Sequence, residues 1–307
     1  MSDALFAILA AARWAQFFSL FVLFGVVLFP FYVTRAAPAP CGERLASSTR
    51  RAIAVAGTVQ PLSLLAWVAT SIASMGDGWI SVGDPGFVKA FFLEASFGRL
   101  WLARLLLTAL LVGALVLARR RLPARNAATG IVLVLVGALL VSQAGIGHPA
   151  ALPDKVRPFV IAGYSLHLLG GAAWIGGLWP LRTILAEAKH DDRVRPYVQF
   201  ALGRFATMAT GAVALVLVGA ALNIQPEVAA LNPSDLTAWG WCVVSKVVLF
   251  GALIAIAYRN RFVLTPLLGA RRKEATKDLL RHVVVDQGLA AVVLAVAAFM
   301  GVTSPTG

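Results

Sequence analysis

Apolar residues in this sequence are gathered into eight long blocks, and these blocks restrict the chain to very few folds. Hydrophobic residues make up 59% of the 307 residues and charged residues only 13%, which leaves too little polar surface for a water-soluble domain. Each block is close to the roughly 20 residues that a helix needs to cross about 30 Å of hydrocarbon. The blocks are too long, and alternate too little, for the strands of a membrane barrel. We therefore predict an all-α integral membrane protein, a bundle of about eight transmembrane helices that forms a single polytopic membrane domain over residues 1–307.

The basic residues of the loops predict how this bundle is oriented. The predicted spans are Ala12–Val33, Ile53–Met75, Phe97–Ala118, Ala128–Ile146, Pro158–Leu181, Leu202–Ile224, Trp239–Tyr258 and Val283–Val302. Lys and Arg number twenty in the loops that follow the odd-numbered spans, and four in the loops that follow the even-numbered spans before the C-terminal tail. Because basic loops remain on the cytoplasmic side, we expect both termini on the outer side of the membrane.

The net charge of +13 and the two cysteines do not indicate other functions. The basic residues lie in loops, where the topology requires them, so we do not interpret the charge as a sign of nucleic-acid binding. Cys41 and Cys242 are predicted on opposite sides of the membrane, so we expect no disulfide between them. Nothing resembles an ATP-binding motif and no catalytic residues are predicted, so we do not expect an enzyme.

Of the four histidines in the sequence, two are predicted at or near membrane depth. His190 and His282 fall in or beside basic loops, and we interpret them as solvated or interfacial. His148 follows the fourth span at the outer face. His167 lies in the fifth span, about 13 Å from its outer end and near the middle of the membrane. Such a histidine is unfavourable unless it is paired or functional, and the simpler alternative is a hydrogen bond to a neighbouring helix.

Glycines flank His167 at near-helical spacing. Gly163, Gly170 and Gly171 share its part of the fifth span. Small residues allow a second helix to approach closely. We therefore expect tight helix packing on the face that carries the histidine.

Histidine and sulfur ligands together indicate copper as the metal. Imidazole binds copper well, and thiolate or thioether sulfur favours Cu(I). Met75, Cys242 and Met300 fall toward the outer ends of their spans, at the depth of His148, although methionine in a membrane helix is commonly a packing residue. The predicted metal ligands are His148, His167, Met75, Cys242 and Met300.

Four further polar side chains fall within the predicted spans. Arg13 and Arg104 lie within about two turns of the outer surface, and we expect them to extend toward it. Lys246 lies about two turns from the outer end of its span. Asp286 lies about one turn from the cytoplasmic end of the last span, where we expect a salt bridge with a basic loop residue.

At these residues the sequence resembles the copper resistance D (CopD) family. The most specific match is Gly147-His148, followed by His167-Leu168-Leu169 and by the run Trp174-Ile175-Gly176-Gly177-Leu178. The strongest part of the resemblance covers residues 128–302. Weaker matches are Phe97-Gly98 with Trp101 and Arg104, Gly203-Arg204-Phe205, Trp239-Gly240 with Lys246, Asn260-Arg261-Phe262 and Thr265-Pro266. The chain departs from the family pattern at Asp286, where the family usually has Glu.

The resemblance implies an eight-helix copper permease of the bacterial inner membrane, with both termini in the periplasm. It implies copper import from the periplasm, with a role in copper homeostasis and resistance, and a separate periplasmic copper-binding partner related to CopC. Copper would meet His148 first and pass to His167, in two sites or in one shared site.

Two other functions remain open at this point. A b-type haem electron carrier needs axial ligands, commonly paired histidines on facing helices, and His148 with His167 are the available pair. A membrane protein that docks a periplasmic copper chaperone without transporting copper is the other alternative. A Soret absorbance band would indicate haem, and copper accumulation in vesicles would distinguish a permease from a docking protein.

Overall fold

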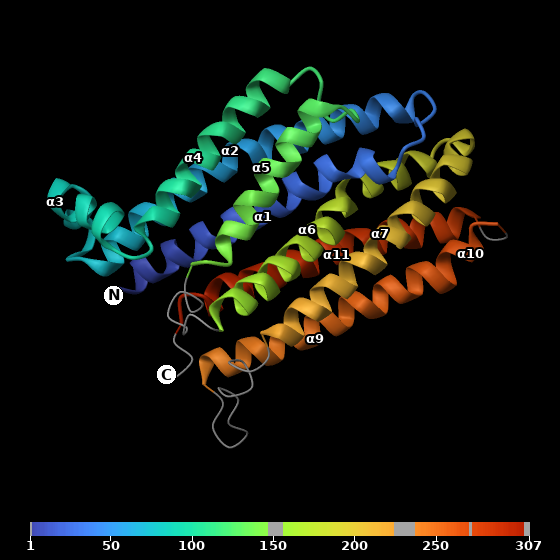
Figure 1. Cartoon of the computed structure of the whole chain (residues 1–307). Coiled ribbons are helices and arrows are strands. Elements are labelled where there is room, and N and C mark those ends of the chain that lie inside the picture. Colours follow the sequence, from blue (N-terminus) through green and yellow to red (C-terminus); the bar gives the residue numbers. More distant parts are fainter. Residues whose placement is uncertain (1, 147–155, 224–236, 270–271, 304–307) are drawn as a thin grey trace.

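The computed structural model describes residues 2–146, 156–223, 237–269 and 272–303, and in these ranges the regular structure is entirely helical (Figure 1). The long helices of the described ranges are α1 (Asp3–Tyr32), α2 (Cys41–Met75), α4 (Gly98–Ala118), α5 (Ala127–Gln143), α6 (Arg157–Ala188), α7 (Arg195–Leu222), α9 (Ala238–Arg259) and α11 (Arg272–Met300). The short elements are η1 (Gly78–Val82), α3 (Pro85–Lys89), η2 (Ala90–Glu94), η4 (Asp192–Val194), η5 (Asn260–Leu264) and α10 (Thr265–Leu267).

The long helices have the length and the surface of membrane spans. Seven of the helices in the described ranges are long and apolar enough to cross a membrane. The remaining one, α5, is apolar but has 17 residues, or about 25 Å of helix. Large apolar side chains face outward, such as Leu117 with 87% of its surface exposed and Val134 with 70%, and lipid is the solvent that suits such a surface. The prediction of an all-α multi-pass membrane bundle is confirmed.

Several helices continue beyond the predicted spans at the basic end of the bundle. Helix α2 begins at Cys41 rather than near Ile53, and α11 begins at Arg272 rather than near Val283. The prediction followed apolar content, whereas helical hydrogen bonding continues through the polar residues that precede each apolar block. Asp286 therefore lies in the middle of α11.

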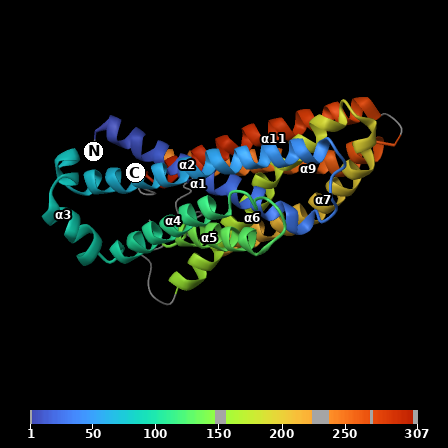
Figure 2. The same ribbon diagram turned by 90° about the horizontal axis from the view of Figure 1, so that it is seen from above.

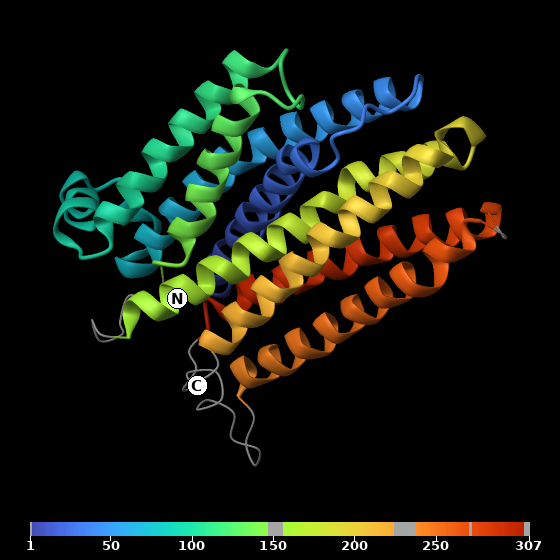
Figure 3. The same cartoon turned by 45° about the vertical axis from the view of Figure 1, so that its right-hand side comes forward.

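Helix α1 lies at the centre of the bundle and packs against α2, α5, α6 and α11 (Figure 3). It approaches α6 most closely where Gly25 faces Gly176. A Cβ atom added to Gly176 would overlap the carbonyl oxygen of Phe21, and one added to Gly25 would overlap the backbone of Gly176. Only glycine therefore permits this approach of two helix backbones.

The helices run antiparallel, so their connections fall at two ends of the bundle (Figure 2). The rings of Phe6 and Phe299 are 5.4 Å apart, which places the start of α1 beside the end of α11. The same end holds the connection between α2 and α4, which contains η1, α3 and η2. The opposite end holds the basic connections. Which end faces the periplasm stays a prediction.

Candidate metal site

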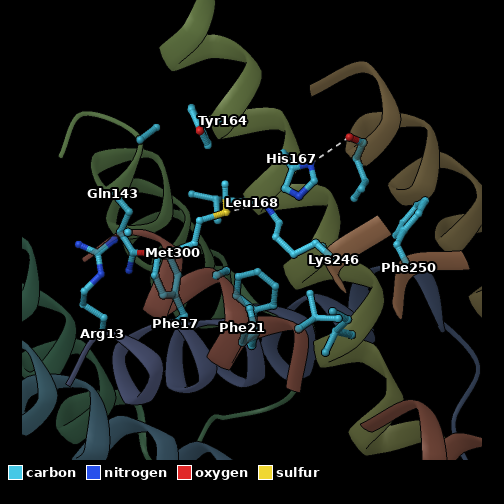
Figure 4. A pocket seen from close by; sticks show the side chains of 18 of the residues that line it. Arg13, Phe17, Phe21, Gln143, Tyr164, His167, Leu168, Lys246, Phe250 and Met300 are labelled. Atoms are coloured by element: carbon cyan, nitrogen blue, oxygen red, sulfur yellow. Dashed lines mark hydrogen bonds between the residues drawn. The ribbon is translucent and has the colours of Figure 1, made fainter. Parts of the chain in front are cut away.

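His167 lies on α6, ten residues after Arg157, and α7 fixes the orientation of its ring. Its Nδ1 atom is 3.0 Å from the carbonyl oxygen of Val216 (Figure 4). A carbonyl only accepts, so Nδ1 carries the proton and donates it, and the neutral ring keeps its lone pair on Nε2. Histidines that bind metals commonly donate their second ring N–H to such an acceptor.

Close packing of α6 and α7 places His167 within reach of this carbonyl. A Cβ atom added to Gly219 would lie 2.9 Å from Cβ of His167, and one added to Gly170 would lie 2.5 Å from the carbonyl oxygen of Ala212. Larger residues at either position would separate the helices and lengthen the bond to Val216. The predicted close packing around His167 is confirmed.

His167 borders a cavity of about 240 Å³ between α1, α5, α6, α7, α9 and α11, which we call the outer cavity (Figure 4). Most of its wall is apolar, with aromatic rings from Phe17, Phe21, Trp174, Trp239 and Phe250. The side chains with N, O or S atoms are Arg13, Gln143, Tyr164, His167, Trp174, Trp239, Lys246 and Met300. None of its described lining residues is Asp or Glu, so the cavity is basic rather than acidic.

Met300 brings a sulfur atom to the same cavity. It is the last residue of α11, only 7% of its surface is exposed, and Nζ of Lys246 lies 3.8 Å from its Sδ atom (Figure 4). A thioether beside an ammonium group accepts a weak hydrogen bond. The outer cavity therefore combines a thioether with a neutral imidazole, and both ligand types suit copper.

The other predicted ligands are placed differently. Cys242 packs beside Met300 and Trp239, but its side chain is not among those that border the outer cavity. Met75 lies at the end of α2 with 56% of its surface exposed, away from the cavity. His148 lies outside the described residues. In the described ranges, no three His, Cys, Asp or Glu side chains gather in a way that could hold a metal ion.

Two further predictions concern the state of the cysteines and the exposure of His190. Cys41 and Cys242 are free, as expected from their positions at opposite ends of the bundle. His190 is exposed after the end of α6, as predicted.

The prediction that Arg104 extends to the outer surface is wrong. Its side chain is completely buried, NH1 donates to Oγ of Ser142 at 3.1 Å, and its guanidinium lies 5.1 Å from the ring centre of Trp67 and 5.5 Å from that of Trp101. The two indole rings supply cation–π stabilisation that hydropathy alone does not reveal. Arg13 lies 4.7 Å from the same Trp67 ring and also borders the outer cavity, so it is only partly buried.

The sequence did not identify Arg13, Gln143 and Tyr164 as neighbours of His167. Gln143 is the last residue of α5, and both polar atoms of its side chain are buried with no hydrogen-bond partner in the described part of the chain. All three residues lie within about three turns of the same end of the bundle. Their similar depth in the bundle was the one feature of the sequence that could have grouped them with His167. Depth alone does not show which faces of the helices point toward each other.

Family models match two long parts of the chain. The model described as copper resistance protein D-like, N-terminal domain, matches residues 1–155. The model described as copper resistance protein D matches residues 199–300. Together they cover most of the helices that border the outer cavity.

Curated relatives match almost the full length of the chain. It is 27% identical to inner membrane protein YebZ of Escherichia coli, over 96% of this chain and 97% of that protein. It is 26% identical to copper resistance protein D of Pseudomonas syringae pv. tomato, over 96% of each. It is 25% identical to copper transport protein CutJ of Bacillus subtilis, of which it spans about half the length, 53%. No solved structure matches the chain.

Proposed function

This chain belongs to the copper resistance protein D family, and from that premise we propose that it carries copper ions across the inner membrane through the outer cavity. It is a multi-pass inner-membrane protein with a function related to copper. The observation that supports a transport role is that His167 and Met300 border one cavity inside the bundle. We propose His167 and Met300 as copper ligands, with His148 and Cys242 as further ligands.

The copper ion in this cavity is Cu(I) in our proposal. A thioether is a soft ligand and favours Cu(I) over Cu(II). The Arg13 side chain borders the cavity, and no carboxylate is joined to it in the described part of the chain. Its positive charge repels a monovalent ion with half the energy that it repels a divalent ion. Both the ligand and the charge therefore favour Cu(I).

We further propose that copper moves inward from the periplasm. Basic residues are concentrated at the end of the bundle opposite the outer cavity, and such residues remain in the cytoplasm. The end of the bundle that holds the start of α1 and the end of α11 then faces the periplasm. A separate CopC-like protein would deliver copper to this face, and the chain has no catalytic role in the proposal.

Copper uptake by proteoliposomes tests this function. The purified full-length protein, reconstituted alone, is expected to accelerate the entry of Cu(I) under reducing conditions at least about tenfold over protein-free liposomes. Equal uptake with and without the protein would reject transport and favour a docking role. A Soret band from the purified protein would instead favour the haem carrier.

Met75 and Met300, the last residues of α2 and α11, provide a matched test of the ligand set. Met300→Leu keeps the apolar volume but removes the thioether, so we expect the affinity for Cu(I) to fall about tenfold. Met75→Leu makes the same chemical change on an exposed side chain away from the cavity, and we expect it to leave the affinity unchanged. Competition with a chromophoric Cu(I) chelator measures both. Equal affinities in the two variants would exclude the Met300 sulfur as a ligand.

A further inference from the structure

A second cavity, of about 310 Å³, lies on the other side of Trp174 from the outer cavity. We call it the inner cavity. Helices α6, α7, α9 and α11 border it together with η5, which lies at the basic end of the bundle. The Trp174 side chain lines both cavities and is 4% exposed. Its ring packs edge to face against that of Phe250, with 6.2 Å between the ring centres. Packed aromatic rings therefore lie between the two cavities.

Asp286 borders the inner cavity and is the carboxylate nearest the middle of α11. It lies 14 residues from each end of the helix, or about 21 Å, and 3% of its surface is exposed. Among the described residues, its Oδ1 atom has no hydrogen-bond partner. The expectation that Asp286 forms a salt bridge with a basic loop residue is therefore wrong, because its side chain faces the inner cavity and takes part in none of the ion pairs of the described residues.

The basic residue that borders the same cavity does not neutralise Asp286. The Arg261 guanidinium donates to Oγ1 of Thr210 and to the carbonyl oxygen of Ala206 on α7. Ion pairs of the described residues join Arg44 to Glu187 and Arg193 to Asp191, and neither involves Arg261 or Asp286. A buried carboxylate is unfavourable unless it binds a cation or takes up a proton.

A second candidate ligand lies one turn away on the same helix. His282 precedes Asp286 by four residues, so the two share a face of α11. Its Nδ1 atom is 2.6 Å from Oδ1 of Asn260, which also borders the inner cavity. The amide oxygen accepts, so Nδ1 donates and Nε2 keeps its lone pair. His282 was predicted to be solvated or interfacial; its side chain is partly buried, and it is not among those that border the inner cavity.

We propose that the Asp286 carboxylate in the inner cavity is the main ligand of a second binding site for the transported copper ion, and that the His282 imidazole, one turn before it on α11, completes the site. This inference rests on the proposed function, since it names the next site on the same route. A carboxylate compensates the charge of the ion, which the outer cavity with Arg13 does not. It is also a harder ligand than a thioether and holds Cu(I) less tightly. Copper thus passes from a soft site to a weaker site that favours release at the basic end.

Counting bound copper in matched variants tests the inner site. The full-length protein is equilibrated with Cu(I) alone under reducing conditions, excess metal is removed, and copper per chain is measured. We expect two ions in the unaltered protein, one in Asp286→Asn, one in His167→Ala, and two in Asp286→Glu. The control Glu274→Gln removes an exposed carboxylate from the first turn of the same helix and is expected to keep both ions.

The outcomes separate this inference from the proposed function. Asp286→Asn is also expected to lower uptake by proteoliposomes at least tenfold, while Asp286→Glu keeps most of it. If Asp286→Asn binds and transports copper like the unaltered protein, the inner site is rejected and transport through the outer cavity stands. If the unaltered protein neither binds nor transports copper, the proposed function itself fails. If Asp286→Asn does not fold, bound copper is counted in His282→Gln instead. Two bound ions in that variant would overturn the inner site.

Discussion

His167→Ala is expected to reduce Cu(I) uptake by proteoliposomes to below about one tenth of the unaltered rate, because it removes the proposed nitrogen ligand from the outer cavity. Because Nδ1 donates to the Val216 carbonyl oxygen, the lone pair of the neutral ring is on Nε2. Alanine leaves that carbonyl without its partner, which costs about 1 kcal/mol in a membrane protein. This loss is small beside the packing of α6 with its neighbours, so the variant should still fold.

A histidine outside the bundle core provides the control for this variant. His190→Ala makes the same substitution on an exposed residue at the end of α6, and we expect uptake to stay within about twofold of the unaltered rate. Thermal unfolding in detergent should give similar midpoints for both variants. Undiminished uptake by His167→Ala would remove the histidine from the transport route, and a large loss with His190→Ala would mean that the basic end also takes part.

The spans and the position of His167 along its helix could be predicted because each depends on local sequence. Apolar content over about 20 residues decides whether a helix enters lipid, and counting residues along a helix gives depth directly. The same counting placed Met300 and Cys242 near one end of the bundle, and in the structure they pack together. Counting could not show that Asp286 faces a cavity rather than a loop, because the direction of its side chain depends on how the helices pack.

The arrangement of side chains around the site could not be predicted because it depends on which helix faces meet. Val216 follows His167 by 49 residues, and nothing in the local sequence pairs them. Met75 and Met300 both lie at helix ends toward the same side, yet α2 packs on α1 and η1, away from the outer cavity, while α11 borders it. Arg104 has a similar explanation, since its stabilising partners Trp67 and Ser142 belong to α2 and α5.

The glycine contact between α1 and α6 connects the packing of the bundle to the site. Helix α6 carries His167 and Trp174, and therefore the ligand of the outer cavity and the ring that separates the two cavities. Gly176 lies two residues after Trp174, against the backbone of α1 at Phe21 and Gly25. Phe21 itself borders the outer cavity. A change in the separation of these helices must therefore alter both the cavity and the stability of the bundle.

Gly176→Ala is accordingly expected to destabilise the protein by about 3 kcal/mol, which is large for the addition of one methyl group. The added Cβ overlaps the carbonyl oxygen of Phe21, and backbone atoms cannot move aside as the end of a flexible side chain can. The two helices must separate, and their contacts over neighbouring turns are lost together. We expect a lower midpoint of thermal unfolding in detergent and a smaller fraction of monodisperse protein after purification.

Gly251→Ala provides the matched control for this prediction, because a Cβ atom at Gly251 on α9 would meet nothing within 4 Å. Alanine there removes the backbone freedom of glycine without a clash, so its unfolding midpoint should equal or exceed that of the unaltered protein. If Gly176→Ala unfolded at the same temperature as Gly251→Ala, the two helix backbones could not lie as close as this packing requires. The position of His167 relative to α1 would then have to be different, and with it the shape of the outer cavity.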